Sequence, residues 1–443
     1  MKNTSVKITG VLLLLLFWIC ASATAAWAEI RLLTLDQALQ IAAERNRDIQ
    51  KAREYIAWAR GKYVEERAAA FPQLTAISYI ARDRDESQEI YGLNMADPVN
   101  KQTAQISLTQ PLFTWGQVSA AVKAAKVGLK SADEQLRLYQ QASQRDVAAA
   151  FYDVLLMRDL HLLAQQNMEQ KKRHLIEVRK KYAEGVATDY DVLAAEVTVE
   201  NSRPDVIRTE SQIRIAQDRL RFHLALDDDI EVTGNLDVVI RPEKTYEESI
   251  ALAKDRRPDL ADMKYRISMS RELVTIASTQ NKPRLDLKGT YGWNRLEQGE
   301  GQGKGVVWSA GIYLTYPLFD GLRTKGRVDQ ANSELRRLQL DEAKLIDMMS
   351  MEIRESISAV QEAAEVVRSI SGTVTQAERL LAMAEKGYEL GIKTRLDVED
   401  AELNLQQARN NLSRARRDYL VARVHLDWVT GVLGEKLFDH RDS

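Results

Sequence analysis

The chain has 443 residues, 28% of them charged, and a formal net charge of only −2, with positive and negative residues well mixed. This balance argues against nucleic acid or an anionic membrane surface as the main partner. The single cysteine, Cys20, lies near the N-terminus, so the rest of the chain offers no disulfide, thiolate metal site or cysteine nucleophile. Only eight prolines and 45% hydrophobic residues favour long helices.

The first residues have the composition of a secretory signal. Two lysines precede an apolar run from Val11 to Ile19, and the small-residue segment Ala26-Trp27-Ala28 follows. The run is shorter than the roughly 18 apolar residues of a membrane helix. We therefore expect residues 1–28 to be a cleaved signal peptide, with an uncleaved anchor as the alternative. No later run is long enough either, so a membrane crossing would have to use strands.

An internal duplication organises the remaining chain. Thr34-Leu35-Asp36-Gln37 recurs 211 residues later as Thr245-Tyr246-Glu247-Glu248, and both segments are typical of capping boxes that begin a helix. Two later motifs recur 206 residues apart: Gln110-Pro111-Leu112-Phe113 with Tyr316-Pro317-Leu318-Phe319, and Tyr182-x-x-Gly185-x-x-Thr188-x-x-Asp191 with Tyr388-x-x-Gly391-x-x-Thr394-x-x-Asp397. The altered spacing indicates that the loop between the strands is about five residues shorter in the second copy.

Each copy is expected to contain a helix, two strands joined by a loop, a long helix, a tight turn and a returning helix. We predict the following organisation: signal peptide 1–28; first repeat 29–226, with strands at 73–81 and 104–112 and a helical hairpin at 117–225; an inter-repeat segment 227–245; second repeat 246–433, with strands at 284–293 and 306–318 and a hairpin at 324–430; and a C-terminal tail 434–443.

The strands of the second copy alternate strictly. Apolar or aromatic residues from Leu285 to Trp293, and again from Trp308 to Leu318, alternate with small or polar ones. A period of two with aromatic ends is typical of a strand with one face in lipid and the other in water. The alternative is an amphipathic sheet packed on a soluble core. The secretory signal favours the barrel.

The long helices come next in each copy. The segments 117–182 and 324–388 contain no proline and are rich in good helix formers. At about 1.5 Å per residue each reaches on the order of 100 Å, so each needs a partner along its length. Turns at Gly185 and Gly391 would supply it by sending the chain back as a second helix. Pro204 predicts a kink or a small break in the first returning helix.

Four strands cannot close a membrane barrel, because the smallest such barrels have about eight and an open edge leaves unpaired backbone groups in lipid. Other copies of the same chain must complete it. Two copies would give a barrel filled by side chains, whereas three give twelve strands and room for water. A conduit therefore favours a homotrimer.

With these features the sequence resembles the TolC-like outer-membrane efflux and secretion channels, from about Leu32 to Leu433. The most specific segment runs from Tyr388 through Gly391 to Ala401. The resemblance implies a mainly α fold: two repeats whose hairpins form an α-barrel across the periplasm, and four strands per chain in a twelve-stranded trimeric β-barrel in the outer membrane of a Gram-negative bacterium. It also implies a periplasmic adaptor and an inner-membrane pump as partners, and a part for the segment around Asp227 to Glu243 in a small equatorial region.

The resemblance also places roles on individual residues. Asp397 and Asp400 match an acidic ring at the periplasmic entrance, while Asp191, Tyr388 and Lys393 match a network that holds the tips closed. Tyr190, in place of a small hydroxyl residue, and Lys393, in place of an arginine, depart from the family pattern. The motif that docks the adaptor matches six residues: Gly185, Val186, Thr188, Gly391, Ile392 and Thr394. The alternative is that the glycines only turn the chain and the aspartates only cap helices.

Other signals point away from chemistry. Gly299-x-Gly301-x-Gly303-Lys304-Gly305 lacks the hydroxyl residue and following helix of a phosphate loop, so we interpret it as a flexible extracellular loop. The five histidines have no ligand spacing, and no catalytic motif is present. We expect no enzyme, cofactor or metal. A periplasmic coiled-coil scaffold and an autonomous porin remain alternatives to an exit duct, and the cargo is not readable from the sequence.

Overall fold

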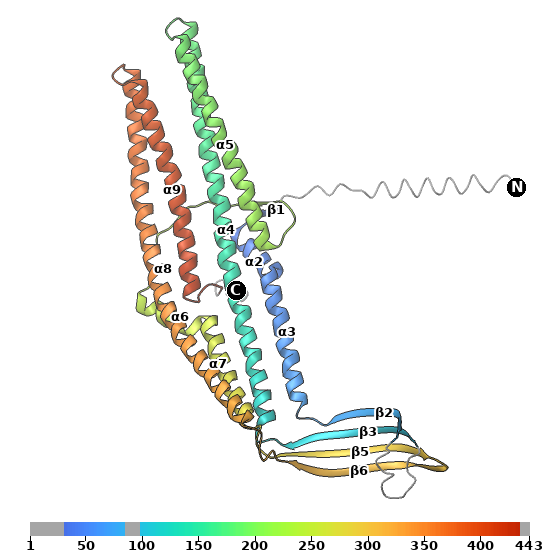
Figure 1. The fold of residues 1–443 in the computed structure, drawn as a ribbon. Helices are drawn as coiled ribbons and strands as arrows, with labels where there is room; N and C mark the ends of the chain where they lie inside the picture. The colour runs from blue at the N-terminus through green and yellow to red at the C-terminus, as the bar shows by residue number, and fades with distance from the viewer. Residues whose placement is uncertain (1–30, 85–97, 435–443) are drawn as a thin grey trace, which may run out of the picture. The chain divides into compact units, whose positions relative to one another are not determined.

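A computed structural model of the protein describes residues 31–84 and 98–434, so the expected signal peptide lies outside the described residues. The elements, in chain order, are β1 (Arg31–Leu33), α2 (Leu35–Arg45), α3 (Arg47–Ala68), β2 (Gln73–Asp83), β3 (Val99–Phe113), α4 (Gln117–Ala183), α5 (Asp189–Leu224), β4 (Ile230–Val232), α6 (Tyr246–Arg256), α7 (Pro258–Ser278), β5 (Arg284–Gln298), β6 (Gly301–Thr315), α8 (Arg323–Glu389) and α9 (Arg395–Val429) (Figure 1). The twofold repeat of helices, two strands and a long hairpin confirms the predicted fold class.

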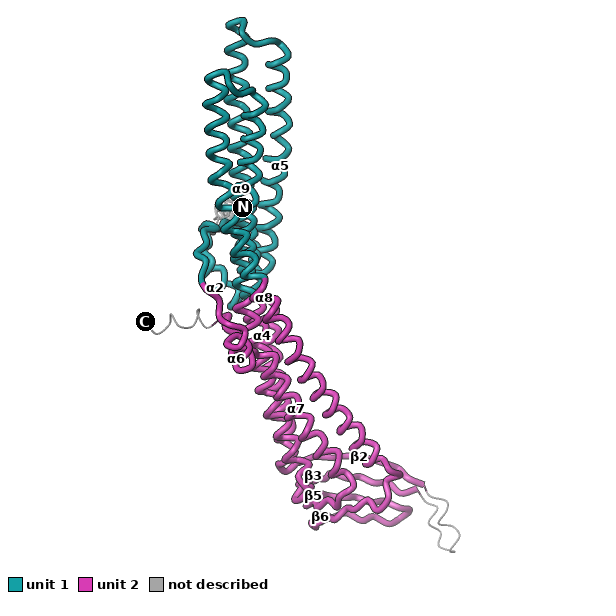
Figure 2. The backbone as a smooth tube through the Cα atoms, turned by 90° about the vertical axis from the view of Figure 1, so that its left-hand side faces the viewer, with its two compact units in different colours: residues 1–46, 143–241, 359–425 teal, residues 47–142, 242–358, 426–443 magenta. Residues whose placement is uncertain are grey.

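The chain divides into two compact units, coloured separately in Figure 2. Unit 1 comprises residues 1–46, 143–241 and 359–425, and it contains the ends of both hairpins. Unit 2 comprises residues 47–142, 242–358 and 426–443, and it contains the strands β2, β3, β5 and β6. The 67-residue helices α4 and α8 contribute to both units.

The sheet of unit 2 has the order β2-β3-β5-β6, with every neighbouring pair antiparallel. Strands β3 and β5, which come from different repeats, pair in the middle. Strands β2 and β6 therefore form the two edges, and each has one side without a partner strand among the residues that the structure describes. The strands of both repeats thus form one surface with a continuous register.

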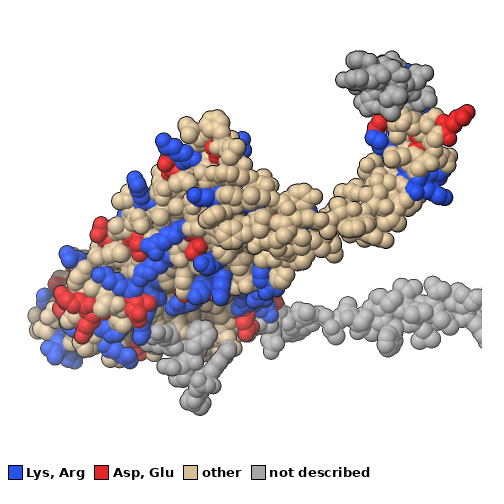
Figure 3. Space-filling view, turned by 90° about the horizontal axis from the view of Figure 1, so that it is seen from below, with Lys and Arg blue, Asp and Glu red and all other residues tan. Residues whose placement is uncertain are grey.

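The register separates the sheet into two chemically different faces, because directly paired residues lie on the same face. On one face the β5–β6 pairs carry no charge: Leu285–Leu314, Leu287–Ile312, Gly289–Ala310, Tyr291–Trp308 and Trp293–Val306. The opposite face carries Asp286, Lys288, Thr290 and Asn294. From Leu285 to Trp293 the uncharged face covers roughly 27 Å at about 3.4 Å per residue. In Figure 3, few charged side chains appear along the strands on the side in view.

The glycine-rich segment of the second repeat is not a loop, and this part of the prediction was wrong. Gln298 pairs with Gly301, so the connection is the two residues Gly299 and Glu300, and β6 begins immediately after them. Gly299 has a φ of 57°, which a tight hairpin turn requires. Glycines at alternate positions can join a ladder when the partner strand supplies the hydrogen bonds, and composition alone does not reveal this pairing.

Of the kink or small break expected at Pro204, the break is absent. Helix α5 runs from Asp189 to Leu224 with Pro204 inside it. A proline removes one backbone donor and leaves the carbonyl four residues earlier, at Glu200, without a helical partner. Pro204 and Glu200 are exposed, so water can satisfy that carbonyl. The packing of the rest of α5 then keeps the helix continuous.

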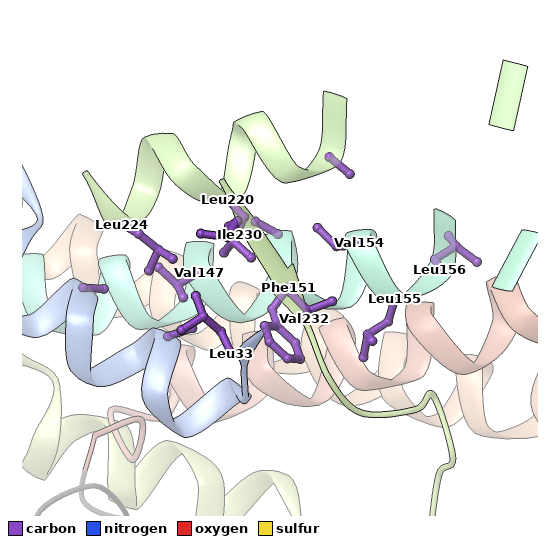
Figure 4. Close-up of a cluster of buried hydrophobic side chains, with 14 of the residues drawn as sticks. Leu33, Val147, Phe151, Val154, Leu155, Leu156, Leu220, Leu224, Ile230 and Val232 are labelled. Atoms are coloured by element: carbon purple, nitrogen blue, oxygen red, sulfur yellow. The ribbon is translucent and has the colours of Figure 1, made fainter. Parts of the chain in front are cut away.

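A hydrophobic core in unit 1 holds the first hairpin together (Figure 4). Val147, Phe151 and Val154 on α4 recur every three or four residues and meet Leu220 and Leu224 on α5. The parallel pair of β1 and β4 lies against the same core, with Leu32 opposite Glu231. The inter-repeat segment thus contains a short strand, β4, that lies against the core of the hairpin.

No helix among the described residues is both long and apolar enough to cross a membrane.

Candidate functional site: the two hairpin tips

The candidate site is built on the turns that join α4 to α5 and α8 to α9, here called the first tip (residues 184–191) and the second tip (residues 390–397). Gly185 and Gly391 have φ values of 78° and 72°, which other residues rarely adopt. The amides of Gly185 and Val186 donate to Tyr182 (3.0 Å) and Lys181 (2.9 Å), and those of Gly391 and Ile392 donate equivalently to Tyr388 and Gly387. Both helices therefore end in a Schellman motif.

The residues that follow these glycines point away from the hairpins. In a Schellman motif the second residue after the cap usually packs on the last helical turn. Val186 and Ile392 are instead 75% and 77% exposed. Tyr190, Leu193 and Leu396 are exposed as well. Each tip therefore presents apolar side chains that the chain itself does not cover.

A capping box begins the returning helix at each tip. At the first, the amide and hydroxyl of Thr188 donate to an oxygen of Asp191 at 2.8 and 2.7 Å. The amide and hydroxyl of Thr394 donate to Asp397 at the same two distances. The Thr188 hydrogen bonds, backbone first, hold the pKa of Asp191 below its usual value. Those from Thr394, with a smaller contribution from Lys393, do the same for the pKa of Asp397.

Lys393 distinguishes the second tip from the first. Its ammonium lies 3.4 Å from Asp397, while Ala187 occupies the equivalent position in the first repeat. Its stem crosses Gly387, where an added Cβ would lie 2.5 Å from the Lys393 Cγ. Gly387 thus leaves the space that lets Lys393 lie against the end of α8.

One contact joins the two hairpins near their tips. The Lys181 ammonium lies 5.4 Å from the centre of the Tyr388 ring, within the range of a cation–π interaction. Farther from the tips, Gln170 on α4 donates to Glu402 on α9 at 2.7 Å. Within the described residues, Asp191 and Tyr388 form no hydrogen bond with each other. The aromatic ring instead faces the base of the first hairpin turn.

Asp400 differs from both capping aspartates. It is exposed one turn after the capping box, and it has no hydrogen-bond or ion-pair partner among the described residues. The expected acidic pair therefore divides into Asp397, whose carboxylate is bound at its own tip, and Asp400, whose carboxylate is available to another molecule. The sequence pattern did not separate these two roles, although the Thr-x-x-Asp spacing contains the capping signal.

Residues 31–84 and 98–434 contain no group of three histidine, cysteine or acidic side chains that could hold a metal ion. Sequence reasoning named Lys393 and Tyr388 but missed Lys181 and its cation–π contact with the Tyr388 ring. A ring and a cation 207 residues apart in the chain carry no local signal of their contact.

Comparisons with known proteins show the family and the fold of the chain. The description of the matching family is "Outer membrane efflux protein", and it matches twice, over residues 38–225 and 249–432. The outer membrane protein TolC of Vibrio cholerae is 25% identical over 393 residues, covering 84% of this chain and 87% of that protein. The alkaline protease secretion protein AprF of Pseudomonas aeruginosa is 25% identical over 335 residues, covering 74% and 69%.

Solved structures show the same fold. A membrane protein from Pseudomonas aeruginosa superimposes with a TM-score of 0.79 at 22% identity, covering 90% of this chain and 92% of that one. The outer membrane channel MtrE of Neisseria gonorrhoeae, solved in an open state, gives 0.74 at 18% identity, covering 90% and 89%. The double family match covers most of the chain, one match for each repeat. The chain therefore belongs to the outer membrane efflux protein family and is an outer-membrane channel subunit of the efflux and secretion type.

Proposed function

We propose that three copies of this chain form a passive exit duct across the outer membrane and the periplasm, opened at the hairpin tips by a periplasmic adaptor and an inner-membrane pump. The proposed duct uses the two repeats, residues 29–226 and 246–433, with residues 227–245 between them. The pump supplies the energy, so the duct itself needs no catalytic group.

The observation that carries the proposal is the sheet with one uncharged face and two open edges. A face about 27 Å long without charge matches the apolar band of a membrane strand, and the opposite face, with Asp286 and Lys288, suits a water-filled lumen. In lipid, the free backbone groups of β2 and β6 need partners. Pairing β6 of one copy with β2 of the next satisfies both edges and closes a ring head to tail.

The helices provide a second pair of complementary edges. Contacts between the hairpins involve α4 with α8 or α9, as in the Gln170–Glu402 and Lys181–Tyr388 pairs. Leu380 and Met383 on α8, and Leu390 directly after its end, are exposed at heptad spacing. On α5, Tyr190, Leu193 and Val197 are exposed at similar spacing. Exposed stripes of this kind favour packing of α5 against α8 of the neighbouring copy.

The tips then serve as the gate and the adaptor-docking surface. Val186 and Ile392 supply exposed apolar groups for docking, beside the turns of Gly185 and Gly391. Three copies of Asp400, with Asp397 behind them, would surround the periplasmic opening with negative charge and favour cations.

Single-channel conductance in planar bilayers tests the proposal. The purified protein should have about three times the 50.2 kDa mass of one chain, less the signal peptide, and should form pores that prefer cations. In the Asp397→Ala/Asp400→Ala variant the cation preference should fall while the pores remain. Pores whose preference is unchanged would remove the acidic gate from the proposal. Well-folded protein that never forms pores would instead favour the coiled-coil scaffold.

A further inference from the structure

A basic recess lies in unit 2 where the strands meet the helices, near the starts of α4 and α8 and the end of α7 (Figure 1). Its volume is about 430 Å³. Four cationic residues line it, Lys282, Arg284, Arg323 and Arg327, against a single acidic one, Asp320. The excess of three positive charges sets it apart from the well-mixed charge of the whole chain.

The acidic residue of the recess forms no ion pair with any of these four cations of the described chain. An oxygen of Asp320 accepts a hydrogen bond from the Thr324 amide at 2.9 Å, and so it caps the start of α8. Arg284 pairs with Asp286 at 2.8 Å, and Arg327 donates to the neutral side chain of Gln280.

The remaining two cations of the recess are available to bind an anion. Lys282 and Arg323 form no ion pair with any described residue, and both are exposed. Two unpaired cations in a concave site attract an anion that can accept several hydrogen bonds at once. A phosphate group meets this requirement, and an arginine offers it a forked pair of donors.

Apolar side chains surround the recess on the side of the strands. Trp115 forms part of its wall. Leu318 and Phe319 lie in the chain between the lining residues Pro317 and Asp320, and they are 87% and 84% exposed. Leu318 and Phe319 lie four and five residues after Leu314, which is at the end of the uncharged sheet face. Aromatic and basic residues at the end of a membrane face are typical of the headgroup level of a bilayer.

The wall of the recess is held in a fixed geometry. Trp115 adopts a φ of 53°, which is rare for a bulky residue, and its indole N–H donates to the Pro283 carbonyl at 2.7 Å. Leu322, at the equivalent turn of the second repeat, also has a positive φ, 65°. Such conformations persist where the surrounding structure over-determines them, and they often accompany binding sites.

We propose that this recess binds a phosphate group, carried by a phospholipid headgroup of the periplasmic leaflet, with Lys282 and Arg323 as its main ligands. This inference rests on the proposed insertion of the strands into the membrane. Free phosphate is the second possible source of the same chemistry, so the test must separate the two.

The test uses the full-length trimer in a neutral detergent, titrated with short-chain phosphatidylglycerol, with short-chain phosphatidylcholine and with inorganic phosphate, and followed by calorimetry. Phosphatidylglycerol should bind more tightly than phosphatidylcholine. In Lys282→Ala/Arg323→Ala its affinity should fall about 25-fold, because each cation near a lipid headgroup contributes about a fivefold change. The Lys282→Arg/Arg323→Lys variant keeps both charges and should bind within about threefold of wild type.

The matched control is Arg336→Ala/Lys344→Ala, which removes two exposed cations of α8 that do not line the recess. It should leave the affinity within about twofold. Equal binding of phosphatidylglycerol by wild type and Lys282→Ala/Arg323→Ala would overturn the inference. Tight binding of inorganic phosphate with no added affinity for the lipid would overturn the lipid source.

The proposed duct is checked separately, by conductance in a bilayer of phosphatidylcholine alone. There Lys282→Ala/Arg323→Ala should form the same pores as wild type, which would also show that the variant folds. If the protein forms pores but does not bind phosphatidylglycerol selectively, lipid binding in the recess is refuted and the proposed duct is not. Selective lipid binding without pores would refute the duct, and with it the membrane setting of this inference.

Discussion

Asp191 and Asp397 form the same capping box at the two tips, but only Asp397 also meets a lysine, with the Lys393 ammonium 3.4 Å away. The duplication has therefore kept the turn and the cap while the electrostatic surroundings diverged. The first tip depends on hydrogen bonds from Thr188 alone, and the second adds a positive charge in the last residue before the cap. The two tips should respond differently to a change of charge.

The first prediction concerns pH. Because the folded-state pKa values of Asp191 and Asp397 are depressed, their stabilisation is fully present above the unfolded pKa, near 3.9, and is lost as pH falls through the folded values. Hydrogen exchange of the tip peptides, corrected for intrinsic rates, should be unchanged from pH 7 to pH 5. It should accelerate severalfold below about pH 4.

Asp397→Asn and Glu184→Gln supply the comparison for this prediction. Asp397→Asn should lose protection already at pH 7 and should no longer titrate. Glu184→Gln removes a carboxylate of the first tip that takes no part in the cap, and it should behave as wild type. Equal acceleration in Asp397→Asn and wild type on acidification would mean that some other group controls the tip.

The second prediction separates the two acidic residues of the second tip. Asp400→Asn should reduce cation preference without loosening the tip, because its carboxylate has no partner among the described residues. A carboxylate about 10 Å from a passing ion contributes about 0.4 kcal/mol in water, so three copies change the preference by up to roughly eightfold, less at high salt.

Reversal potentials in a salt gradient measure the cation preference of the pore, and hydrogen exchange measures how firmly the second tip is held. Asp397→Asn should change both, since this carboxylate is also the cap. Glu184→Gln removes the same charge from the other tip and should leave the reversal potential closer to wild type. If Asp400→Asn loosened the tip as much as Asp397→Asn, the assignment of separate roles would be wrong.

Much of the fold was readable from the sequence, because periodicity and repetition are local signals. Strict alternation identified β5 and β6, and glycine after an uninterrupted helical stretch located the turns at Gly185 and Gly391. The predicted strand at 104–112 is longer in the structure, since β3 begins at Val99. Residues such as Lys101 break the apolar pattern, but the register pairs this lysine with Leu296, and it also forms an ion pair with Asp83.

Features that depend on distant partners were not readable. The glycine-rich start of β6 is a strand only because β5 supplies hydrogen bonds along it. The continuity of α5 through Pro204 depends on packing elsewhere along the helix. The Lys181–Tyr388 contact and the basic recess each bring together residues from both repeats, and no spacing within one repeat encodes them.

The third prediction concerns the Lys181–Tyr388 contact between the hairpins. An exposed cation–π interaction contributes about 0.5–1 kcal/mol. If it holds the hairpins together in the resting state, Tyr388→Leu should raise the open population roughly two- to fivefold. Tyr388→Phe keeps the ring and should open as wild type does. Single-channel recordings measure this directly, and an equal effect of Phe and Leu would assign the role to the hydroxyl.

The fourth prediction concerns a buried arginine in unit 2. The Arg257 side chain is only 7% exposed, and it bonds to Asp259 at 2.6 Å and to Glu352 of α8 at 2.7 Å. The Val429 carbonyl accepts a further bond at 3.4 Å. Burial opposes the charge, but bonds to Asp259 and then Glu352 outweigh it and leave the pKa of Arg257 raised. This one guanidinium therefore connects α7, α8 and the end of α9.

Removing this residue should destabilise unit 2 more than any surface change nearby. Arg257→Ala leaves two partly buried carboxylates without their cation, which costs about 3 kcal/mol or more. We expect a fall in Tm of roughly 5–10 °C by scanning calorimetry. Arg257→Lys keeps the charge but not the forked pair of donors, so its Tm should lie between those of wild type and Arg257→Ala. Arg271→Ala, which removes an exposed arginine of α7, should change the Tm little. A similar loss in Arg271→Ala and Arg257→Ala would show that the buried connection contributes nothing specific.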